Sequence, residues 1–318
     1  MYPSNSTVTP RPDIGLGFEE FDQEANQEGY IGLTLCPVAE AELAFGQYEV
    51  IKAEEDTREV DDTRNPDGSY QEVDGNFEFR PYSTKEHGLE SRVDDNQANV
   101  FSRVVSQEIR AAKRVRTMMK ERHEQRVIDL LNAKTAAHTY TGNEFDDPTF
   151  DLAGLFVDLI YQFRIQCGAE PTHFTADTDV INRMLLNGSI QDKYVGSADR
   201  TGKAIADTGL AAALNLKGIV RANSVRNTAT APKAKSFATM FPRTLGVLSI
   251  SSDEADTVPV QWAKTIHWSG DGSKIGGAFE TYYSAKRRGT MVRSRSQYKV
   301  HELYPDAIMT LDGIITPS

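Results

Sequence analysis

The chain has 318 residues, a formal net charge of −11, 39% hydrophobic residues and 25% charged residues. This is the composition of an ordinary globular protein, with enough chain for one large domain or two. The acidic balance argues against a sequence-reading nucleic-acid protein, because such proteins need a basic excess. No apolar run reaches the ~18 residues that a membrane helix requires, so we expect no membrane partner.

Residues 1–44 are predicted to form an N-terminal arm with little core of its own. The segment carries four prolines and the acidic piece EEFDQEANQEG, and it lacks the basic start and apolar centre of a signal peptide. A short strand is predicted at Ile31–Leu35. Segments that cannot fold alone usually order on a neighbour. The two cysteines, Cys36 and Cys167, lack metal-ligand spacing and are predicted to be free thiols in a reducing compartment.

Residues 45–90 are predicted to form an extended β-hairpin loop. Apolar residues alternate in Gln47–Lys52 and in Gln71–Tyr82, and a turn signal lies at Asn65–Gly68. The intervening stretch is acidic and contains Glu54, Glu55, Asp56, Glu59, Asp61 and Asp62. Two interpretations stay open: a floppy surface loop, or an arm whose carboxylates meet a basic patch on an adjacent copy of the chain.

The stretch from Asp94 to about Ala137 is predicted to be one long helix. It contains no Pro or Gly and is rich in good helix formers. Asp94 and Asp95 are candidate N-caps. Roughly 40 residues would make a rod ~60 Å long. An apolar stripe runs along the rod and fades across Lys120–Arg126, which is predicted to be solvated or to face another subunit.

The rest of the chain alternates helices with short apolar strands, which favours a compact α/β unit. Helices are predicted at Leu152–Gln166, Val180–Leu186 and Gly202–Leu214. Strands are predicted at Gly218–Ala222, Thr244–Ile250, Val258–Trp268, Ala278–Ser284 and Thr290–Ser296, with two more inside Gln297–Ile315. Asp177 and Asp179 are predicted to cap the helix that starts near Val180.

No residue set with a catalytic, cofactor-binding or metal-binding pattern is found. Gly196–Ala204 (GSADRTGKA) imitates a phosphate-binding loop, but the glycine spacing is one residue too long and Ala204 replaces the Ser or Thr. The six histidines are scattered without a metal-binding spacing. We therefore expect neither a cofactor nor an enzyme.

The order of the segments resembles that of the major capsid proteins of tailed bacteriophages. The matching segments include PVAEAELAFGQYEVIKAEEDTREVDD, FRPYSTKEHGLESRVDDNQ, the long helix, TGNEFDDPTFDLAGLFVDLI, HFTADTDVINRMLLNGSIQDKY and YKVHELYPDAIMTLDGII. Each segment is a weak signal alone, and their order along nearly the whole chain carries the resemblance. These proteins share the Hong Kong-type capsid fold with encapsulin shells.

The resemblance implies an α+β fold with an N-terminal arm, an extended loop and two domains. Residues 91–140 and 257–296 would form a peripheral domain with the long helix as its spine. Residues 141–256 and 297–318 would form an α/β axial domain. Only about 40 residues precede the loop, too few for a built-in scaffold domain. We therefore expect a separate scaffolding protein or none.

The function implied is that of a major capsid protein that self-assembles into the icosahedral head shell of a tailed double-stranded DNA phage. The implied partners are other copies in hexamers and pentamers, portal, scaffolding and decoration proteins, and packaged DNA held by weak non-specific contacts. The chain would be assembled in the host bacterial cytoplasm and located in the virion. One alternative is an encapsulin-like nanocompartment shell. A more remote one is a soluble α/β enzyme using Asp177, Asp179 or His173.

In a shell subunit, the acidic loop needs cationic partners on a neighbouring copy. The candidate subunit-contact cations are Arg114, Arg122 and Arg126 on the helix, and Arg287 and Arg288 in the turn between the strands predicted at Ala278–Ser284 and Thr290–Ser296. Other cations nearby are Arg110, Lys113, Arg116, Lys120 and Lys286. Each exposed pair contributes only about 0–1 kcal/mol, so the effect lies in register and summation. The alternative is that both charge sets are solvated faces.

Overall fold

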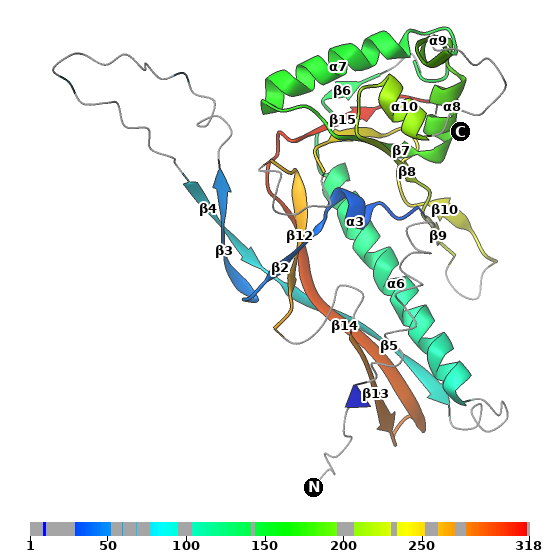
Figure 1. Cartoon of the computed structure of the whole chain (residues 1–318). Helices are drawn as coiled ribbons and strands as arrows, with labels where there is room; N and C mark the ends of the chain where they lie inside the picture. Colours follow the sequence, from blue (N-terminus) through cyan, green and yellow to red (C-terminus); the bar gives the residue numbers. More distant parts are fainter. Residues whose placement is uncertain are drawn as a thin grey trace.

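The computed structural model describes residues 9–10, 29–51, 59, 68, 77–94, 104–140, 144–195, 207–229, 234–251, 260–270 and 278–316. It consists of two mixed sheets, a long helix that runs beside one of them, and two projecting hairpins (Figure 1). The β sheets and helices together give the α+β class expected from the sequence.

The lower sheet is built around β14 (Gly289–Glu302). One edge of β14 pairs with β5 (Lys85–Asp94). Along its other edge, the first half of β14 pairs with β13 (Ala278–Ser284) and the second half with β12 (Ala263–Trp268). Two short strands from the N-terminal arm complete the sheet: β1 (Thr9–Pro10) pairs with β13, and β2 (Val38–Ala41) pairs in parallel with β12.

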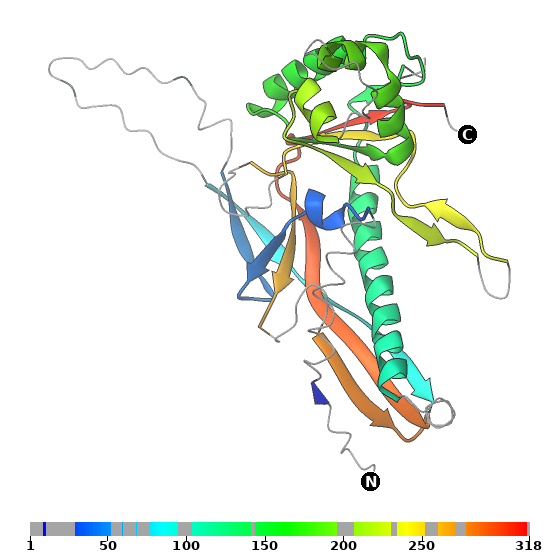
Figure 2. The ribbon, with the colours of Figure 1, turned by 45° about the vertical axis from the view of Figure 1, so that its right-hand side comes forward.

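The long helix α6 (Val104–Asn132) lies along this sheet (Figures 1 and 2). Its 29 residues give a rod of about 44 Å, and the helix ends at Asn132, before the predicted end near Ala137. Asp94 is not an N-cap: it is the last residue of β5 and pairs with Gly289. Asp95 lies outside the described residues. Pairing with β14 overrides the helical composition here, because it buries Val93 and satisfies the backbone of β5.

The apolar stripe of α6 is confirmed, since Ala112, Val115, Met119, Val127, Ile128 and Leu131 are buried. The prediction for Lys120–Arg126 is wrong for its central residues. His123 and Glu124 are only 8% and 1% exposed, and the same chain covers them. They are in phase with the stripe, because His123 follows Met119 by four residues and precedes Val127 by four.

The upper sheet has the order β6 (His138–Thr139), β15 (Ile308–Asp312), β11 (Gly246–Ser249), β7 (His173–Asp177) and β8 (Gly218–Ala222). The helices packed with it are α7 (Leu152–Cys167), α8 (Thr178–Leu186), α9 (Gly188–Val195) and α10 (Asp207–Ala213). The main core lies here and includes Phe156, Phe163, Phe174, Val247 and Leu311.

Local signals explain the helix ends in this part. Asp151 caps α7 by accepting from the Gly154 N–H at 2.9 Å, and Gly168, at φ 74°, ends that helix. Asp177 caps α8 by accepting from the Asp179 N–H at 2.8 Å, which confirms its predicted role. The sequence does not predict α9, because Asn187-Gly188 is a helix stop signal and α9 begins at that glycine.

The N-terminal arm departs from prediction at its end. Residues Gly32–Leu35 form one helical turn, α3, where a strand was predicted. Ile31, Leu35 and Cys36 are fully buried in the main core, so the end of the arm belongs to the body of the same chain. Both cysteines are free thiols, as predicted, and both are buried.

Two hairpins project from this body (Figure 2). The predicted one consists of β3 (Phe45–Ile51) and β4 (Phe77–Ser83), paired from Phe45↔Ser83 to Ile51↔Phe77. The second, β9 (Val225–Asn227) and β10 (Phe237–Thr239), was not predicted because its strands are only three residues long.

The predicted domain limits stay a prediction, although two elements cross them. β5 begins at Lys85, inside the range predicted for the loop, and β14 continues to Glu302, beyond residue 296. Within the described residues, no helix combines the length and apolar character needed to cross a membrane.

Candidate functional site

The hairpin β3–β4 has one face held on the body and one face exposed. On the inner face Val50 is 2% exposed. The Tyr48 hydroxyl donates to the Glu302 carbonyl oxygen at 3.4 Å, and the Arg80 guanidinium donates to the Leu303 carbonyl oxygen at 2.8 Å. On the outer face Phe45 and Phe79 are 75% and 56% exposed. An apolar face on a two-stranded ribbon indicates a surface for another protein molecule, because such ribbons are marginal alone.

The acidic candidates are on the loop that this hairpin carries. Glu59 is exposed. Glu54, Glu55, Asp56, Asp61 and Asp62 lie outside the described residues.

The candidate cations of α6 differ in their surroundings. Arg114 and Arg122 are exposed, and no carboxylate of the described residues forms an ion pair with them. Arg126 is engaged inside the chain: it donates to the Tyr298 hydroxyl at 2.6 Å, lies 3.1 Å from His87 Nδ1, and stacks over the Tyr298 ring. Arg116 is buried, with only 5% of its surface exposed. A contact role therefore fits Arg114 and Arg122 better than Arg126.

The β13–β14 turn holds the other candidates, and Lys286, Arg287 and Arg288 are all exposed. Arg287 pairs with Glu90 at 2.8 Å. The Tyr282 hydroxyl also donates to Glu90, and this bond together with Arg287 lowers the pKa of Glu90. Arg288 has a φ of 44°, which fits the tight turn. Unlike Arg287, Arg288 forms no ion pair with a carboxylate of the described residues.

A buried polar junction that the sequence analysis missed lies at the middle of α6. The Glu124 carboxylate accepts from the N–H groups of Ile31 and Gly32 at 3.1 and 2.7 Å, and from the Ser224 hydroxyl at 3.3 Å. It caps α3, which has no side-chain cap of its own. Burial raises the pKa of Glu124, against the effect of these hydrogen bonds. One carboxylate thus joins the arm, the long helix and the segment that precedes β9.

His123 extends the junction to the lower sheet. The Thr265 hydroxyl donates to the Cys36 carbonyl oxygen at 2.9 Å, so its oxygen can accept from His123 Nε2–H at 3.1 Å. Gly32 makes the close packing possible, since a Cβ there would lie 2.8 Å from Glu124 and 2.9 Å from the His123 ring. The sequence did contain a signal for this junction: His123 and Glu124 have the helical spacing of the apolar stripe, which indicates that they are buried.

His123 should make the protein less stable in acid. Burial, reinforced by Arg126 and His87, lowers the pKa of His123 from 6.5 to about 4. Below pH 6.5 the unfolded chain takes up a proton that the folded chain refuses, so stability falls as the pH drops and levels off near pH 4. The loss is about 3 kcal/mol for this group.

Urea unfolding at several pH values measures this slope. Glu124 has the opposite effect on stability just above pH 4.5. Because its pKa is raised in the folded chain, the folded chain binds a proton before the unfolded chain does, and stability rises as the pH falls. The His123→Gln variant therefore isolates the histidine contribution: it should remove the part of the acid destabilisation that His123 causes and leave the part due to His87 and His301, whose pKa values burial also lowers. A variant with an unchanged slope would show that another group causes it.

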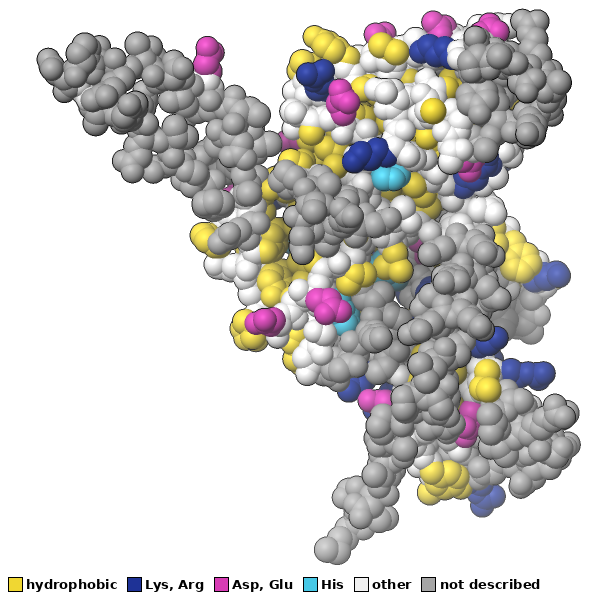
Figure 3. Space-filling model, in the orientation of Figure 1, with side chains coloured by type: hydrophobic (Ala, Val, Ile, Leu, Met, Phe, Trp, Pro, Cys, Tyr) yellow, Lys and Arg dark blue, Asp and Glu magenta, His cyan; other side chains and the backbone are white. Residues whose placement is uncertain are grey.

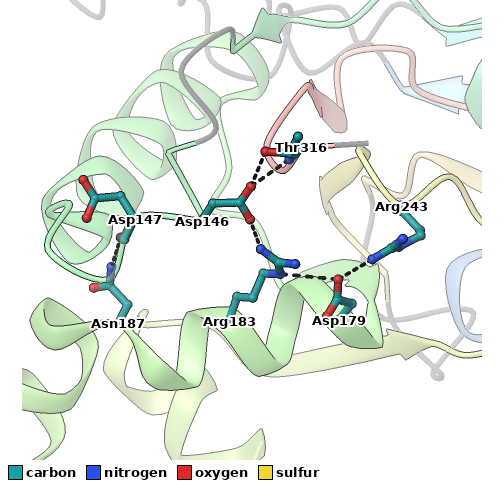
Figure 4. A network of polar contacts seen from close by, with 7 residues as sticks. All are labelled: Asp146, Asp147, Asp179, Arg183, Asn187, Arg243 and Thr316. Carbon is teal, nitrogen blue, oxygen red and sulfur yellow. Dashed lines mark hydrogen bonds and ion pairs between the residues drawn. The ribbon is translucent and has the colours of Figure 1, made fainter. Parts of the chain in front are cut away.

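A second polar network fixes the end of the chain on the upper sheet (Figure 4). Asp146 accepts from the N–H and hydroxyl of Thr316 at 2.8 and 2.6 Å and pairs with Arg183. Asp179 pairs with Arg243 at 2.6 Å and with Arg183 at 3.3 Å. The acids considered for an enzyme thus serve as a helix cap, Asp177, and an ion-pair centre, Asp179. No cluster of three metal-ligating side chains occurs among the described residues.

Comparison with known proteins gives the fold. No family model matches the sequence, and no curated protein matches it. A phage-related protein of Bordetella bronchiseptica has a similar structure, with a TM-score of 0.71 and 15% identity over 98% of this chain and 99% of that chain. The capsid structure of the cyanophage P-SCSP1u gives 0.56 at 13% identity, covering 89% and 87%. An encapsulin complex of Synechococcus elongatus gives 0.53 at 13% identity, covering 88% and 86%.

The chain has the Hong Kong-type capsid fold. The resemblance predicted from the order of sequence segments is thereby confirmed at the level of the fold. In the Hong Kong-type fold of this chain, α6 takes the place of the spine helix and β3–β4 that of the extended loop. In this fold the outer face of that loop, with Phe45 and Phe79, and the cations Arg114, Arg122 and Arg288 are exposed.

Proposed function

We propose that this chain is a shell-forming subunit, the major capsid protein of a tailed double-stranded DNA phage. The observation that carries the proposal is the exposed apolar face of the projecting β3–β4 hairpin in a chain with a capsid fold. A thin wall reaches the areas typical of obligate interfaces, about 2,000–5,000 Å², only if such elements overlap neighbouring copies. The proposal assigns no catalytic role to the chain.

Within such a shell, the acidic loop meets cations of an adjacent copy. Of the cations predicted for this contact, Arg126 and Arg287 have intrachain partners. Arg114, Arg122 and Arg288 are exposed, so we assign the contact to them. Each ion pair contributes only about 0–1 kcal/mol, so its main effect is to fix how one copy is aligned against the next.

The domain division belongs to the same proposal. The peripheral domain comprises the long helix with the lower sheet, and the axial domain comprises the upper sheet with its helices. The partners would be portal, scaffolding and decoration proteins and the packaged DNA, held weakly and without sequence preference. The subunit would be assembled in the cytoplasm of a bacterial host and end in the virion.

An encapsulin-like compartment is the second candidate, and the likeness to the encapsulin complex of Synechococcus elongatus favours it. A compartment shell has no portal and no genome. Particles of one small size that assemble without a scaffold would favour the compartment.

Electron microscopy and size-exclusion chromatography of the purified protein test the function. We expect closed shells, tubes or ring-shaped capsomers. Salt should shift the balance between them, because exposed charge pairs are screened. A protein that stays monomeric at every concentration and salt tested would exclude both shell functions and leave the soluble α/β protein.

A further inference from the structure

One stretch of the chain has a charge opposite to that of the whole. Between Asp207 and Asp253 there is no acidic residue, whereas the full chain carries −11. The cations of this stretch are Lys217, Arg221, Arg226, Lys233, Lys235 and Arg243. The β9–β10 hairpin lies in its middle.

This hairpin is basic, apolar and open to solvent. All six residues of its strands are exposed, with Val225 at 49% and Phe237 at 64%. Lys235 stacks over the Phe237 ring at 6.0 Å. Arg226 donates to Gln125 of α6 at 2.5 Å, which anchors the base of the hairpin. A two-stranded ribbon with both faces exposed is marginal alone, so this one is suited to be covered by another molecule.

A second surface has the complementary character. We call residues 40–43 the acidic corner: Glu40, Glu42 and Leu43 are exposed there, Leu43 at 64%. The corner is held rigidly, because Trp268 Nε1–H donates to the Glu42 carbonyl oxygen at 3.0 Å and the Tyr82 hydroxyl donates to that of Leu43 at 3.1 Å. No ion pair within the described residues uses Glu40 or Glu42.

The two surfaces lie on opposite edges of the molecule. In both ribbon views α6 separates the β9–β10 hairpin from the connection between β2 and β3 (Figures 1 and 2). In the space-filling view, acidic and hydrophobic side chains gather at the edge over the β2–β3 connection, and basic and hydrophobic ones at the opposite edge over the hairpin (Figure 3). The hairpin of one chain therefore cannot reach its own acidic corner.

We propose that the β9–β10 hairpin of one copy docks on the acidic corner of the next copy. Lys235 and the N–H groups of Arg226 that do not bond Gln125 face Glu40 and Glu42, and Phe237 packs against Leu43. Because different surfaces meet, the contact is head-to-tail, and it generates a ring when the rotation between copies closes. The inference rests on the proposed shell function and specifies which edges join neighbouring subunits.

Charge reversal tests the docking. The pair Glu40→Lys/Glu42→Lys and the pair Arg226→Glu/Lys235→Glu should each raise the concentration needed for assembly about tenfold or more. All four changes in one chain should restore assembly, because every reversed hairpin then meets a reversed corner. The matched control, Glu170→Lys/Asp192→Lys, changes two exposed acids elsewhere by the same charge and should leave assembly unchanged.

Disulfide trapping gives an independent readout. Leu43→Cys combined with Phe237→Cys should give a ladder of crosslinked multimers under mild oxidation, since both natural cysteines are buried. Either change alone should give at most dimers. The docking is wrong if the chain with all four charge changes does not assemble and the double cysteine variant gives no ladder of multimers. Shells that form normally from the reversed hairpin but contain less nucleic acid also overturn it, in favour of a hairpin that faces a polyanion.

The wild-type chain separates the two proposals. If it forms shells and both tests fail, only the docking is wrong. If it forms no particle, the shell function fails, and the crosslinked ladder alone decides the docking.

Discussion

Replacing Glu124 with alanine should destabilise the folded chain by about 4 kcal/mol and lower the thermal midpoint by on the order of 10 °C. The substitution leaves three buried donors without their acceptor: the N–H groups of Ile31 and Gly32 and the hydroxyl of Ser224. Water cannot easily replace the carboxylate, because Glu124 is 1% exposed. Differential scanning calorimetry and urea unfolding of the purified variant measure the loss.

Two further variants define the cause. Glu124→Gln keeps the size and one carbonyl acceptor, so its loss should be smaller than that of alanine. Asp129 lies on the same helix, but its side chain is exposed and, among the described residues, accepts only from Gln125, so the effect of Asp129→Ala should stay within about 0.5 kcal/mol. If Glu124→Ala were as mild as this control, the carboxylate would not be the group that joins the arm to the helix.

The double variant Phe45→Ser/Phe79→Ser should abolish assembly into shells while leaving the subunit folded. Both side chains are already exposed in the isolated chain, at 75% and 56%, so their loss changes its unfolding little. In an assembled shell, covering the exposed parts of the two phenylalanines contributes about 2–4 kcal/mol per subunit. Sedimentation velocity and electron microscopy measure assembly, and circular dichroism checks the fold.

The matched control is Gln47→Ser, an exposed polar residue that lies opposite Pro81 on the same face of the hairpin. It changes the same surface without removing apolar area and should assemble normally. Shells formed by the double variant at wild-type concentrations would mean that the outer face of the hairpin is not an interface.

The sequence predicted much of the fold because its signals are local. The alternation around Tyr48 and Val50, the apolar stripe from Ala112 to Leu131 and the capping by Asp177 each depend on a few neighbouring residues. The prediction of local structure failed where residues far away in the sequence determine it. The turn at Gly32–Leu35 is helical because Glu124, some 90 residues away, caps it. Asp94 is in a strand because Gly289 pairs with it.

The candidate contact residues show the same division. The sequence alone predicted the cations of α6 and of the β13–β14 turn as contact candidates. It could not show that Arg114 is exposed whereas Arg126 is hydrogen-bonded within the chain. Only the folded chain brings Tyr298 and His87 against Arg126. The β9–β10 hairpin escaped prediction because three-residue strands carry too little periodicity.

By itself the sequence determined the long helix, the projecting hairpin, the alternating upper part and the order of segments that resembles a capsid subunit, since periodicity and turn residues act over a few positions. The tertiary structure alone decided that the polar middle of the helix is an internal junction, and which charged and apolar side chains remain exposed on opposite edges. Burial and pairing depend on residues far apart in the chain, and only folding brings these together.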